Sequence, residues 1–329
     1  MERINAQSTF TDLTVAELGG PKARAFFDVC EREIPFDQLA ASVTDLFVDD
    51  NPKGGRPHWP LVTMIKVLFL QKCFGLSDPM AEEMLLDRIS FRRFVGLSLD
   101  DETLDHSTLS IFRKRLRDNG HGSTLFDKSL EILRARGLVM NTGTLIDATI
   151  IEAPLGSKRE DGSKATDPCA SKTVKGGRPH HGYRAHVATD RRGIITDYVY
   201  DTARVSEHEH FDHLARHEHK AVFADSGCRS KDRVQRLRAR GVVAGICHRR
   251  VRGQKELRPE QKRLNRLIAP IRAFVEHPFA WIKRGLNNRR ARYRGLTRNA
   301  QDFALSAMAC NFCRSFTFKP TPTMVAMSA

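Results

Sequence analysis

Apolar side chains recur at helical spacing through residues 21–137, and few runs there alternate as a strand would. The spacing predicts helices over residues 22–33, 36–46, 60–74, 79–88, 107–119 and 125–136. Pro60 suits a first helical turn, and Asp105 offers N-cap chemistry just before the helix at 107. Residues 1–20 lack periodicity. We therefore expect residues 1–138 to form an all-helical N-terminal domain.

From Gly143 the pattern changes to short apolar runs separated by turn residues. Strands are predicted at 144–151, 182–189, 194–200, 221–224 and 242–247, and helices at 207–217, 231–240 and 264–287. The polar residues 156–179 and the basic residues 248–263 are predicted to be loops. The order β-β-β-α-β-α-β-α is that of an α/β, ribonuclease-H-like fold with a mixed sheet. This domain is expected over residues 139–318, followed by a flexible tail at 319–329.

Three carboxylates stand out by their positions on these elements. Asp147 interrupts an apolar strand, where an acidic side chain is costly to bury unless it is paired or bound to metal. Asp225 directly follows the strand at 221–224, and strand ends are common positions for sites in open α/β sheets. Glu276 lies in a helical pattern. Carboxylates from two strands and a helix can converge on divalent metal.

Two basic residues share the predicted helix with Glu276. At 100° per residue, Arg272 and Lys283 fall within about 40° of Glu276 on one face. Each residue also has an ordinary explanation: Asp147 as an edge-strand residue, Asp225 as a turn cap, and Arg272 with Glu276 as an i,i+4 ion pair. Taken together and in order, the residues favour a functional site.

The charge of the chain is concentrated in one segment. The net charge is +15, and residues 229–299 alone hold 22 Lys and Arg against 4 Asp and Glu, while the rest of the chain has a balance of −3. A solvated face or a disordered arm is the alternative interpretation. Because the segment is also apolar at helical spacing, a folded nucleic-acid face is favoured.

The helix at 107–119 carries Arg113 and Arg115 and follows a predicted helical pair at 79–95. It could be the reading helix of a helix-turn-helix unit. A structural bundle with an ordinary charged face explains the pattern equally well, and the sequence does not separate the two.

Cysteine and histidine usage gives little sign of a metal site. The seven Cys are irregularly spaced and no signal peptide opens the chain, which fits reduced thiols in the cytoplasm and no membrane span. Cys310 and Cys313 have no second pair and are expected to pack in a core. His210, His213 and His217 could share a helical face, but a solvated helix is favoured over a zinc site.

Several motifs resemble those of one family, the DDE transposases of bacterial insertion sequences, specifically the insertion sequence 5 family. The most specific stretch is VEHPFAWIKR at 275–284, continued by ARYRGLTRN at 291–299. GTLIDATIIEAP at 143–154 is similar to the segment that carries the family's first Asp, and GYRAH at 182–186 to its next strand. TLDHSTL at 103–109 is similar to an element of the N-terminal domain.

The resemblance implies a transposase that cleaves terminal inverted repeats and transfers the ends into target DNA, using Mg²⁺ or Mn²⁺. Asp147, Asp225 and Glu276 would be the catalytic and metal-binding triad. The DNA-binding residues would be Arg272, Lys283, Arg284, Arg289, Arg290, Arg292, Tyr293 and Arg294, with Arg113 and Arg115 in the N-terminal domain. Double-stranded DNA is the expected partner, with a homodimer on DNA and a nucleoid-associated, cytoplasmic location.

This chain departs from the family pattern at two positions: Cys228 replaces a usual Tyr after the second Asp, and Arg204 replaces a common Asn. A catalytically decayed, DNA-binding copy that acts as a repressor is the alternative function. A simple nuclease without strand transfer is a further alternative, but it needs neither the helical domain nor the basic segment.

Overall fold

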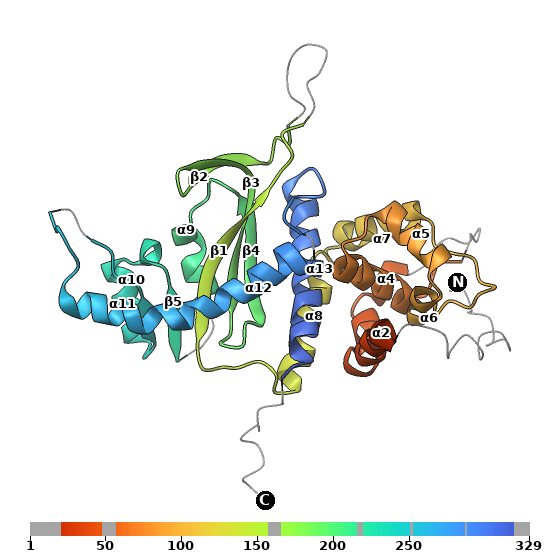
Figure 1. Cartoon of the computed structure of the whole chain (residues 1–329), viewed down its shortest axis with the longest axis horizontal. Coiled ribbons are helices and arrows are strands. Elements are labelled where there is room, and N and C mark those ends of the chain that lie inside the picture. Colours follow the sequence, from red (N-terminus) through yellow and green to blue (C-terminus); the bar gives the residue numbers. More distant parts are fainter. Residues whose placement is uncertain are drawn as a thin grey trace, which may run out of the picture. The chain divides into compact units, whose positions relative to one another are not determined.

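Figure 1 shows the computed structural model of the chain, which describes residues 21–47, 57–156, 166–215, 220–250, 253–286 and 288–318. The chain divides into two compact units. The helical unit comprises Met1–Ile132 with Ala304–Thr317, and the sheet unit comprises Leu133–Phe303 with Phe318–Ala329. Helix α13, Leu296–Ser315, therefore contributes residues to both.

The helical unit contains the predicted helices, except that the helix predicted over 36–46 ends at Ala41 and a 3₁₀ turn follows it. Its elements are α2 (Pro21–Glu33), α3 (Phe36–Ala41), the 3₁₀ turn η1 (Thr44–Phe47), α4 (Leu61–Phe74), α5 (Asp78–Asp87), α6 (Ile89–Val95), α7 (His106–Asp118) and the start of α8 (Thr124–Ala135). The side chains of Ser77 and Asp105 accept from backbone N–H groups and cap α5 and α7, and the cap at Asp105 was predicted.

Helix α4 is the centre of this unit. It is apolar on all sides, and its residues Ile65, Leu68 and Phe69 are almost fully buried. Phe69 packs against Phe36 and Phe94 with ring centroids 5.7 and 6.4 Å apart. Burial of these side chains in the core leaves them unable to form an exposed apolar contact surface.

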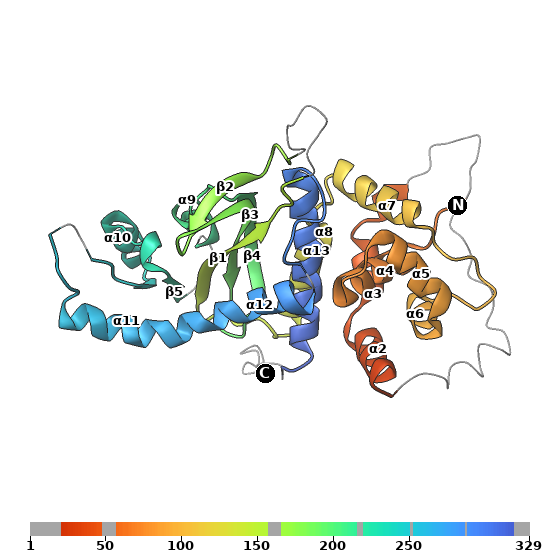
Figure 2. The same cartoon turned by 45° about the horizontal axis from the view of Figure 1, so that its top comes forward.

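The sheet unit contains a six-stranded mixed sheet in the order β2-β3-β1-β5-β6, with β4 paired to β3. The strands are β1 (Thr144–Glu152), β2 (Ser171–Lys175), β3 (Arg178–Thr189), β4 (Ile195–Thr202), β5 (Ala221–Ala224) and β6 (Val243–Ile246). β3 pairs with β1, β2 and β4 in antiparallel fashion, and β5 lies parallel to β1 and β6. Figure 2 shows this sheet with helices around it.

The prediction of a loop over 156–179 is wrong in its last part, because β2 forms a hairpin with β3. Gly176 and Gly177 make the turn, both with positive φ (58° and 75°), a conformation that glycine adopts without strain. β2 reads Ser-Lys-Thr-Val-Lys and is largely exposed, so it carries no apolar alternation to reveal it. Residues 157–165 of the predicted loop lie outside the described residues.

Helices cover both faces of the sheet. Alternation along the strands points Ile146, Val222 and Ala224 to one face, where they pack with residues of α9 (Glu207–Leu214) and α10 (Lys231–Ala239). On the opposite face, Phe303 of α13 contacts Tyr198 and Tyr200, with ring centroids 5.3 and 5.7 Å apart. α11 (Pro259–Arg272) packs against β5.

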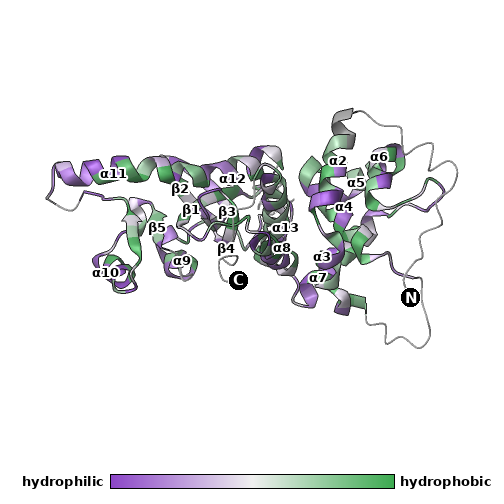
Figure 3. Ribbon diagram, turned by 90° about the horizontal axis from the view of Figure 1, so that it is seen from below, coloured by the Kyte–Doolittle hydropathy of each residue, from purple (hydrophilic) through white to green (hydrophobic). Residues whose placement is uncertain are grey.

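The helix predicted over 264–287 begins earlier and is not uniform. α11 starts at Pro259, inside the predicted basic loop 248–263, because proline suits a first helical turn. A 3₁₀ turn, η3 (Ala273–Val275), a short helix, α12 (Glu276–Ala280), and a π-helical turn, η4 (Trp281–Gly285), then follow in line. Hydrophilic and hydrophobic residues alternate along α11, as expected for a helix with one solvated side (Figure 3).

The cysteine pair at the end of α13 packs in the helical unit, as predicted. Cys310 is fully buried, and the Sγ of Cys313 lies 3.9 Å from the Sγ of Cys73. Burial raises the pKa of Cys310 to about 12, which keeps the thiol protonated. Within the described part of the chain, every helix is too short or too polar to cross a bilayer.

Candidate active site

Two aspartates lie near the place where two neighbouring parallel strands separate. β5 pairs with β1 up to the Leu145–Phe223 pair, and Asp147 and Asp225 each lie two residues further along their chains. Asp225 follows the last residue of β5 but keeps an extended backbone, with φ −71° and ψ 163°. The strand alternation therefore continues for one more residue and directs both carboxylates to the same face.

Asp147 is the more enclosed of the two. Burial raises the pKa of its carboxyl group, and the nearby negative charge of Asp225 acts in the same direction. A hydrogen bond from the Ala148 N–H, 2.8 Å from Oδ1, and the positive charges of Arg272 and Lys175 oppose this rise. Because burial disfavours the charged form of Asp147, a nearby cation would stabilise its carboxylate.

Arg272 links the helical run to this aspartate pair. Its Nη1 lies 3.2 Å from Oδ1 of Asp225 and 3.9 Å from Sγ of Cys247, at the end of α11. The charges of Asp225 and Asp147 raise the pKa of the guanidinium despite its burial. Arg272 therefore lies beside the aspartate pair, while its role in binding DNA stays a prediction.

Glu276 is not gathered with the two aspartates. It is exposed at the start of α12, and η3 just before it winds three residues in a 3₁₀ turn. Each 3₁₀ residue advances about 120° rather than 100°, so Glu276 is turned roughly 60° from the direction that a regular α-helix gives it. The shared face of Arg272, Glu276 and Lys283 was predicted for a regular α-helix, from which this segment departs, and the role of Glu276 stays a prediction.

The charges of the two aspartates also act on another acidic residue, Glu207. It is the first residue of α9 and partly buried. Burial raises the pKa of Glu207, the charges of Asp147 and Asp225 raise it further, and Lys175 and Arg184 oppose them. No sequence signal distinguishes this residue, because a single Glu in the first turn of a helix is common.

The aspartate pair fits a divalent cation by its donor chemistry. Among the described residues, no three His, Cys, Asp or Glu side chains are grouped so that they could hold a metal ion by themselves. Mg²⁺, however, keeps several waters and is commonly bound through one or two carboxylates together with substrate phosphates. Asp147 and Asp225 meet that requirement, since both supply hard oxygen donors from neighbouring strands.

Basic residues border the far end of β1. Residue Arg290 forms a bridge with Glu152, where the Glu152 N–H donates to the carbonyl of Arg289 (3.3 Å) and the Ala291 N–H donates to the carbonyl of Glu152 (2.8 Å). The side chains of Arg289 and Arg290 are exposed. Burial lowers the pKa of Lys283, and the positive charges of Lys175 and Arg289 lower it further. Cationic groups therefore gather beside the strand that carries Asp147.

Asp167 holds the next part of this basic segment on the sheet. Its carboxylate accepts from the hydroxyl of Tyr183 on β3 and from the N–H of Gly295, at 2.9 Å. Asn299 donates to the carbonyls of Tyr293 and Gly295 at 2.7 and 2.8 Å and closes the same loop. Tyr293 and Arg292 are partly buried, whereas Arg294 is exposed, as is Arg284 of η4.

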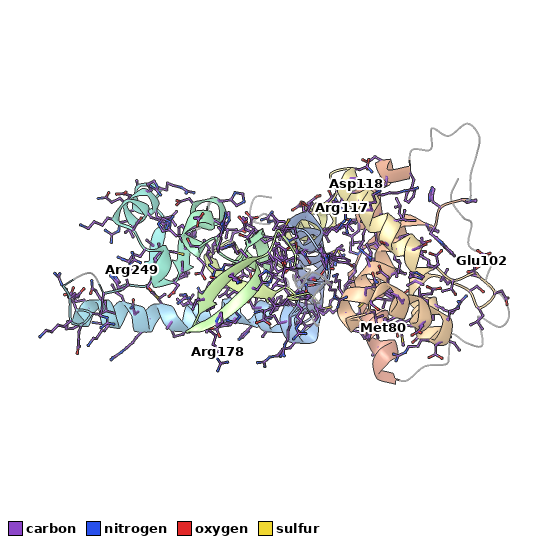
Figure 4. All side chains as sticks on the ribbon, turned by 90° about the horizontal axis from the view of Figure 1, so that it is seen from above. Met80, Glu102, Arg117, Asp118, Arg178 and Arg249 are labelled. Carbon is purple, nitrogen blue, oxygen red and sulfur yellow. The ribbon has the colours of Figure 1, made fainter. Side chains whose placement is uncertain are left out.

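A groove of about 680 Å³ lies at the same end of the sheet. It is lined by Glu152, Lys172, His180, His181 and Arg290, together with apolar residues. Figure 4 shows two further exposed arginines of this unit, Arg178 and Arg249, which extend away from the ribbon. These features give the sheet unit a basic surface.

The two arginines of α7 differ in their surroundings. Arg113 is buried at 7% exposure, and its guanidinium donates to Asp78 and, at 3.0 Å, to Gln71. Arg115 is exposed and lies over the ring of Phe47, 5.2 Å from its centroid. Arg113 is thus held inside the helical unit, and only Arg115 presents its charge to solvent.

The connection between α6 and α7, residues 96–105, is longer than the three- or four-residue turn of a helix-turn-helix motif. Buried Arg92 fixes it by donating to the carbonyls of Ser98 and Asp101 and to the hydroxyl of Thr103. This arrangement favours the structural bundle over a simple helix-turn-helix unit.

The histidines of α9 pair with aspartates of β4. Nε2 of His210 lies 3.0 Å from Asp201, and Nε2 of His213 lies 3.7 Å from Asp197. His217 lies outside the described residues. His210 and His213 thus contact carboxylates, and among the described residues no group of three His, Cys, Asp or Glu could hold a metal ion.

Comparison with known proteins gives two family matches. Residues 140–312 match the family described as Transposase DDE domain, and residues 20–115 match the family described as Transposase domain (DUF772). The first match spans more than half of the chain and contains every candidate residue of the sheet unit.

Two solved structures are also similar to the chain. The piggyBac transposase synaptic complex with hairpin DNA has 9% identity and a TM-score of 0.45, over 92% of this chain and 76% of that one. The Mos1 strand transfer complex has 12% identity and a TM-score of 0.20, over 85% and 90%. Both scores are too low to indicate a shared fold.

Proposed function

Because the chain belongs to the transposase DDE domain family, we propose that it is a metal-dependent transposase of the insertion sequence 5 type. It cleaves DNA at terminal inverted repeats and transfers the ends into target DNA. The sheet unit acts as a ribonuclease-H-like catalytic domain. The observation that supports the proposal is the parallel pairing of β1 and β5, since Asp147 and Asp225 each follow the Leu145–Phe223 pair by two residues.

In this proposal Asp147 and Asp225 would hold a Mg²⁺ or Mn²⁺ ion, whose chemistry would be to polarise the attacking water or DNA 3′-hydroxyl and to offset charge on the scissile phosphate. Asp147 is suited to this task because its burial leaves its charge poorly compensated. Arg272 neutralises Asp225 in the free protein and lies within reach of phosphate oxygens when DNA binds. Glu276, exposed at the start of α12, is the proposed third carboxylate of the triad.

The basic residues beside β1 are proposed to hold the DNA backbone. Arg284, Arg289, Arg290 and Arg294 are exposed, and Lys283, Arg292 and Tyr293 flank them. Their contacts with phosphates give affinity without sequence preference. The groove lined by Lys172, His180 and Arg290 offers a path for the strand that leaves the site.

The N-terminal domain, residues 1–138, is proposed to contribute sequence preference. Arg115 is the residue of α7 whose charge is accessible, and it is therefore the candidate base reader of that helix. Arg113 supports the helix through Asp78 instead.

The working form is proposed to be a homodimer on DNA, because two transposon ends must be joined to one target. Residues 229–299 carry +18 on each chain, so two free chains repel one another until DNA neutralises them. Light scattering with and without a short end duplex tests this. A complex that joins two DNA ends but contains a single protein chain would contradict the proposed homodimer.

Cleavage of an inverted-repeat duplex taken from the DNA that flanks the gene tests the proposed function. The wild type is expected to nick the end in Mg²⁺ or Mn²⁺ and to stop in chelator, and Asp147→Asn and Asp225→Asn are each expected to reduce nicking at least about a hundredfold. Binding of the duplex without any cleavage by the wild type would instead favour the catalytically decayed repressor.

A further inference from the structure

A pocket of about 240 Å³ lies within the helical unit. Its walls come from η1, the segment just before α4, the connection between α6 and α7, and α7 itself. All of its lining residues fall between positions 47 and 115, inside the stretch 20–115 that matches the family described as Transposase domain (DUF772). The pocket therefore belongs to this unit alone.

Aromatic side chains form much of the wall of this pocket. The rings of Phe47 and His58 stack, with centroids 4.0 Å apart and 17° between their planes, and the guanidinium of Arg115 lies over the Phe47 ring. Trp59 and Phe112 complete the aromatic part of the lining. Such a wall favours a flat, unsaturated ligand, because aromatic rings and guanidinium planes both stack on the face of one.

Hydrogen-bonding groups also line the pocket, and their positions are fixed. The carboxylate of Asp105 accepts from the N–H and the hydroxyl of Thr108, at 2.8 and 3.0 Å. Hydrogen bonds from Ser107 and Thr108 lower the pKa of Asp105 to about 2, so this acceptor stays ionised. Thr103 is held by Arg92, whose Nη1 donates to its hydroxyl at 2.7 Å. These groups can bond the polar edge of a ring without rearrangement.

Size and charge narrow the ligand further. A cavity of about 150 Å³ accommodates benzene, whereas drug-sized ligands occupy about 300–1,000 Å³. The volume here therefore suits one small ring system. Asp105 disfavours a phosphate inside the pocket, whereas Arg115, which lines the pocket, and its neighbour Lys114 are both exposed and attract a phosphate from solvent. An uncharged heteroaromatic ring joined to a phosphate meets both conditions.

We propose that this pocket binds a single unpaired base of DNA, with the base against the aromatic side chains and the adjoining phosphate near Arg115. This inference rests on the proposed function and names the part of the DNA that the helical unit takes up. A base inside a duplex is stacked and paired, so only an unpaired or extruded base can enter. Arg115 would then act beside that base rather than on an edge in a groove.

Binding of a short duplex of arbitrary sequence with a single-stranded extension tests the proposal in the full-length protein. The extension carries either 2-aminopurine, whose fluorescence falls when it stacks, or an abasic residue with the same phosphates, and chelator prevents cleavage. The wild type is expected to quench the 2-aminopurine and to bind this duplex about 5- to 150-fold more tightly than the abasic one, the range for stacking one base on aromatic side chains. Equal affinity for the two duplexes would overturn the proposal.

Two variants locate the effect in the pocket. Ile111 lines the pocket and is 52% exposed, so Ile111→Trp obstructs it from the solvent side. Leu86→Trp is the matched control, because Leu86 of α5 is 64% exposed and does not line the pocket. Ile111→Trp should lose the quenching and the affinity advantage of the base, and Leu86→Trp should keep both. Loss in both variants would overturn the assignment to this pocket.

His58→Ala removes one ring of the wall instead of filling the space, with thermal unfolding as the check that the variant folds. The advantage of the base over the abasic residue should fall at least about fivefold. If Ile111→Trp and folded His58→Ala both keep the full advantage, the base binds elsewhere and the proposal is refuted.

Cleavage of a fully paired end duplex distinguishes failure of this inference from failure of the proposed function. If the wild type cleaves that duplex but binds the two extensions equally, the transposase assignment stands and the base pocket is refuted. If the wild type prefers the base through this pocket but cleaves no end, the pocket stands and the catalytic proposal fails.

Discussion

Nη1 of Arg272 lies 3.2 Å from Oδ1 of Asp225, so a cation from the end of α11 already occupies the neighbourhood of one proposed metal ligand. The side chain of Asp225 is 48% exposed, and solvent therefore screens this ion pair. The positive charge of Arg272 partly compensates the negative charges of Asp225 and Asp147. A divalent cation bound by these aspartates would therefore compete with Arg272.

Replacing Arg272 should reveal that competition. Arg272→Gln is expected to tighten Mn²⁺ binding by the DNA-free protein by up to about fivefold, which corresponds to the roughly 1 kcal/mol ceiling of an exposed ion pair. The same variant should lose end cleavage, because it can no longer bind a phosphate through the guanidinium. Arg266→Gln, an exposed arginine on the same helix, is the control for net charge, and its Mn²⁺ affinity should not change. Weaker Mn²⁺ binding by Arg272→Gln alone would contradict the competition.

The exposure of Glu276 predicts a separation between two readouts. Glu276→Gln should leave the Mn²⁺ affinity of the DNA-free protein within about twofold of the wild type, because this side chain is not gathered with Asp147 and Asp225. It should nevertheless reduce end cleavage at least about a hundredfold if the helical run brings it to the site on DNA. Calorimetry and a nicking assay on one preparation check both parts. Normal cleavage would remove Glu276 from the triad.

The basic segment beside β1 should dominate DNA affinity. Neutralising Arg289, Arg290, Arg292 and Arg294 together should weaken binding to all duplexes alike. The slope of log K against log salt should become shallower by about 0.9 for each phosphate that the variant no longer neutralises. The control is an equal change on α10 and its C-cap, at Lys231, Arg236, Arg238 and Arg240, which are also exposed. If both sets reduce affinity and slope equally, only net charge matters and the assigned DNA face is wrong.

The two arginines of α7 should behave differently on removal. Arg113→Ala leaves Asp78 without its buried partner and should lower the free energy of unfolding by about 3 kcal/mol, as expected when one member of a buried pair is removed. Arg115→Ala should leave thermal stability nearly unchanged and reduce the preference for end DNA over random DNA. Equal stability of the two variants would mean that the ion pair with Asp78 contributes little.

Asp167 should make stability depend on pH on the acid side. Burial acts to raise the pKa of this carboxyl group, but hydrogen bonds from Tyr183, Gly295 and Cys169 and the charge of Arg294 outweigh it, and the pKa is lowered. A group with a lowered pKa in the folded state stabilises the protein above its unfolded pKa, about 3.9, and this contribution disappears as the pH falls through the folded value.

Asp167→Asn should therefore cost about 1–3 kcal/mol of unfolding free energy at pH 7, and the difference from the wild type should shrink as the pH is lowered below about 4. Thermal unfolding over this range measures it. Asp87→Asn, at an exposed position of α5, serves as the control and should follow the wild type at every pH. A constant difference between Asp167→Asn and the wild type would show that the charge is not what stabilises the loop.

Local patterns in the sequence determined the helices of the N-terminal half, the strands that carry and precede Asp147 and Asp225, and the basic segment. They could do so because the burial of one face repeats at fixed intervals along a helix or strand. β2 escaped prediction, since an exposed, polar edge strand has no such repeat. The winding of residues 273–285 escaped as well, because a few residues of 3₁₀ or π geometry leave no trace in apolar spacing.

Only the tertiary structure decided which side chains meet. The parallel register of β1 and β5 brings Asp225 to Asp147, although 78 positions separate them in the chain. Likewise, the ion pair between Asp78 and Arg113 joins helices that lie 35 residues apart in the chain. Such contacts depend on which elements pair and on how far each strand extends. The residues next to these side chains determine neither the pairing of elements nor the length of the strands, so no local pattern could predict these contacts.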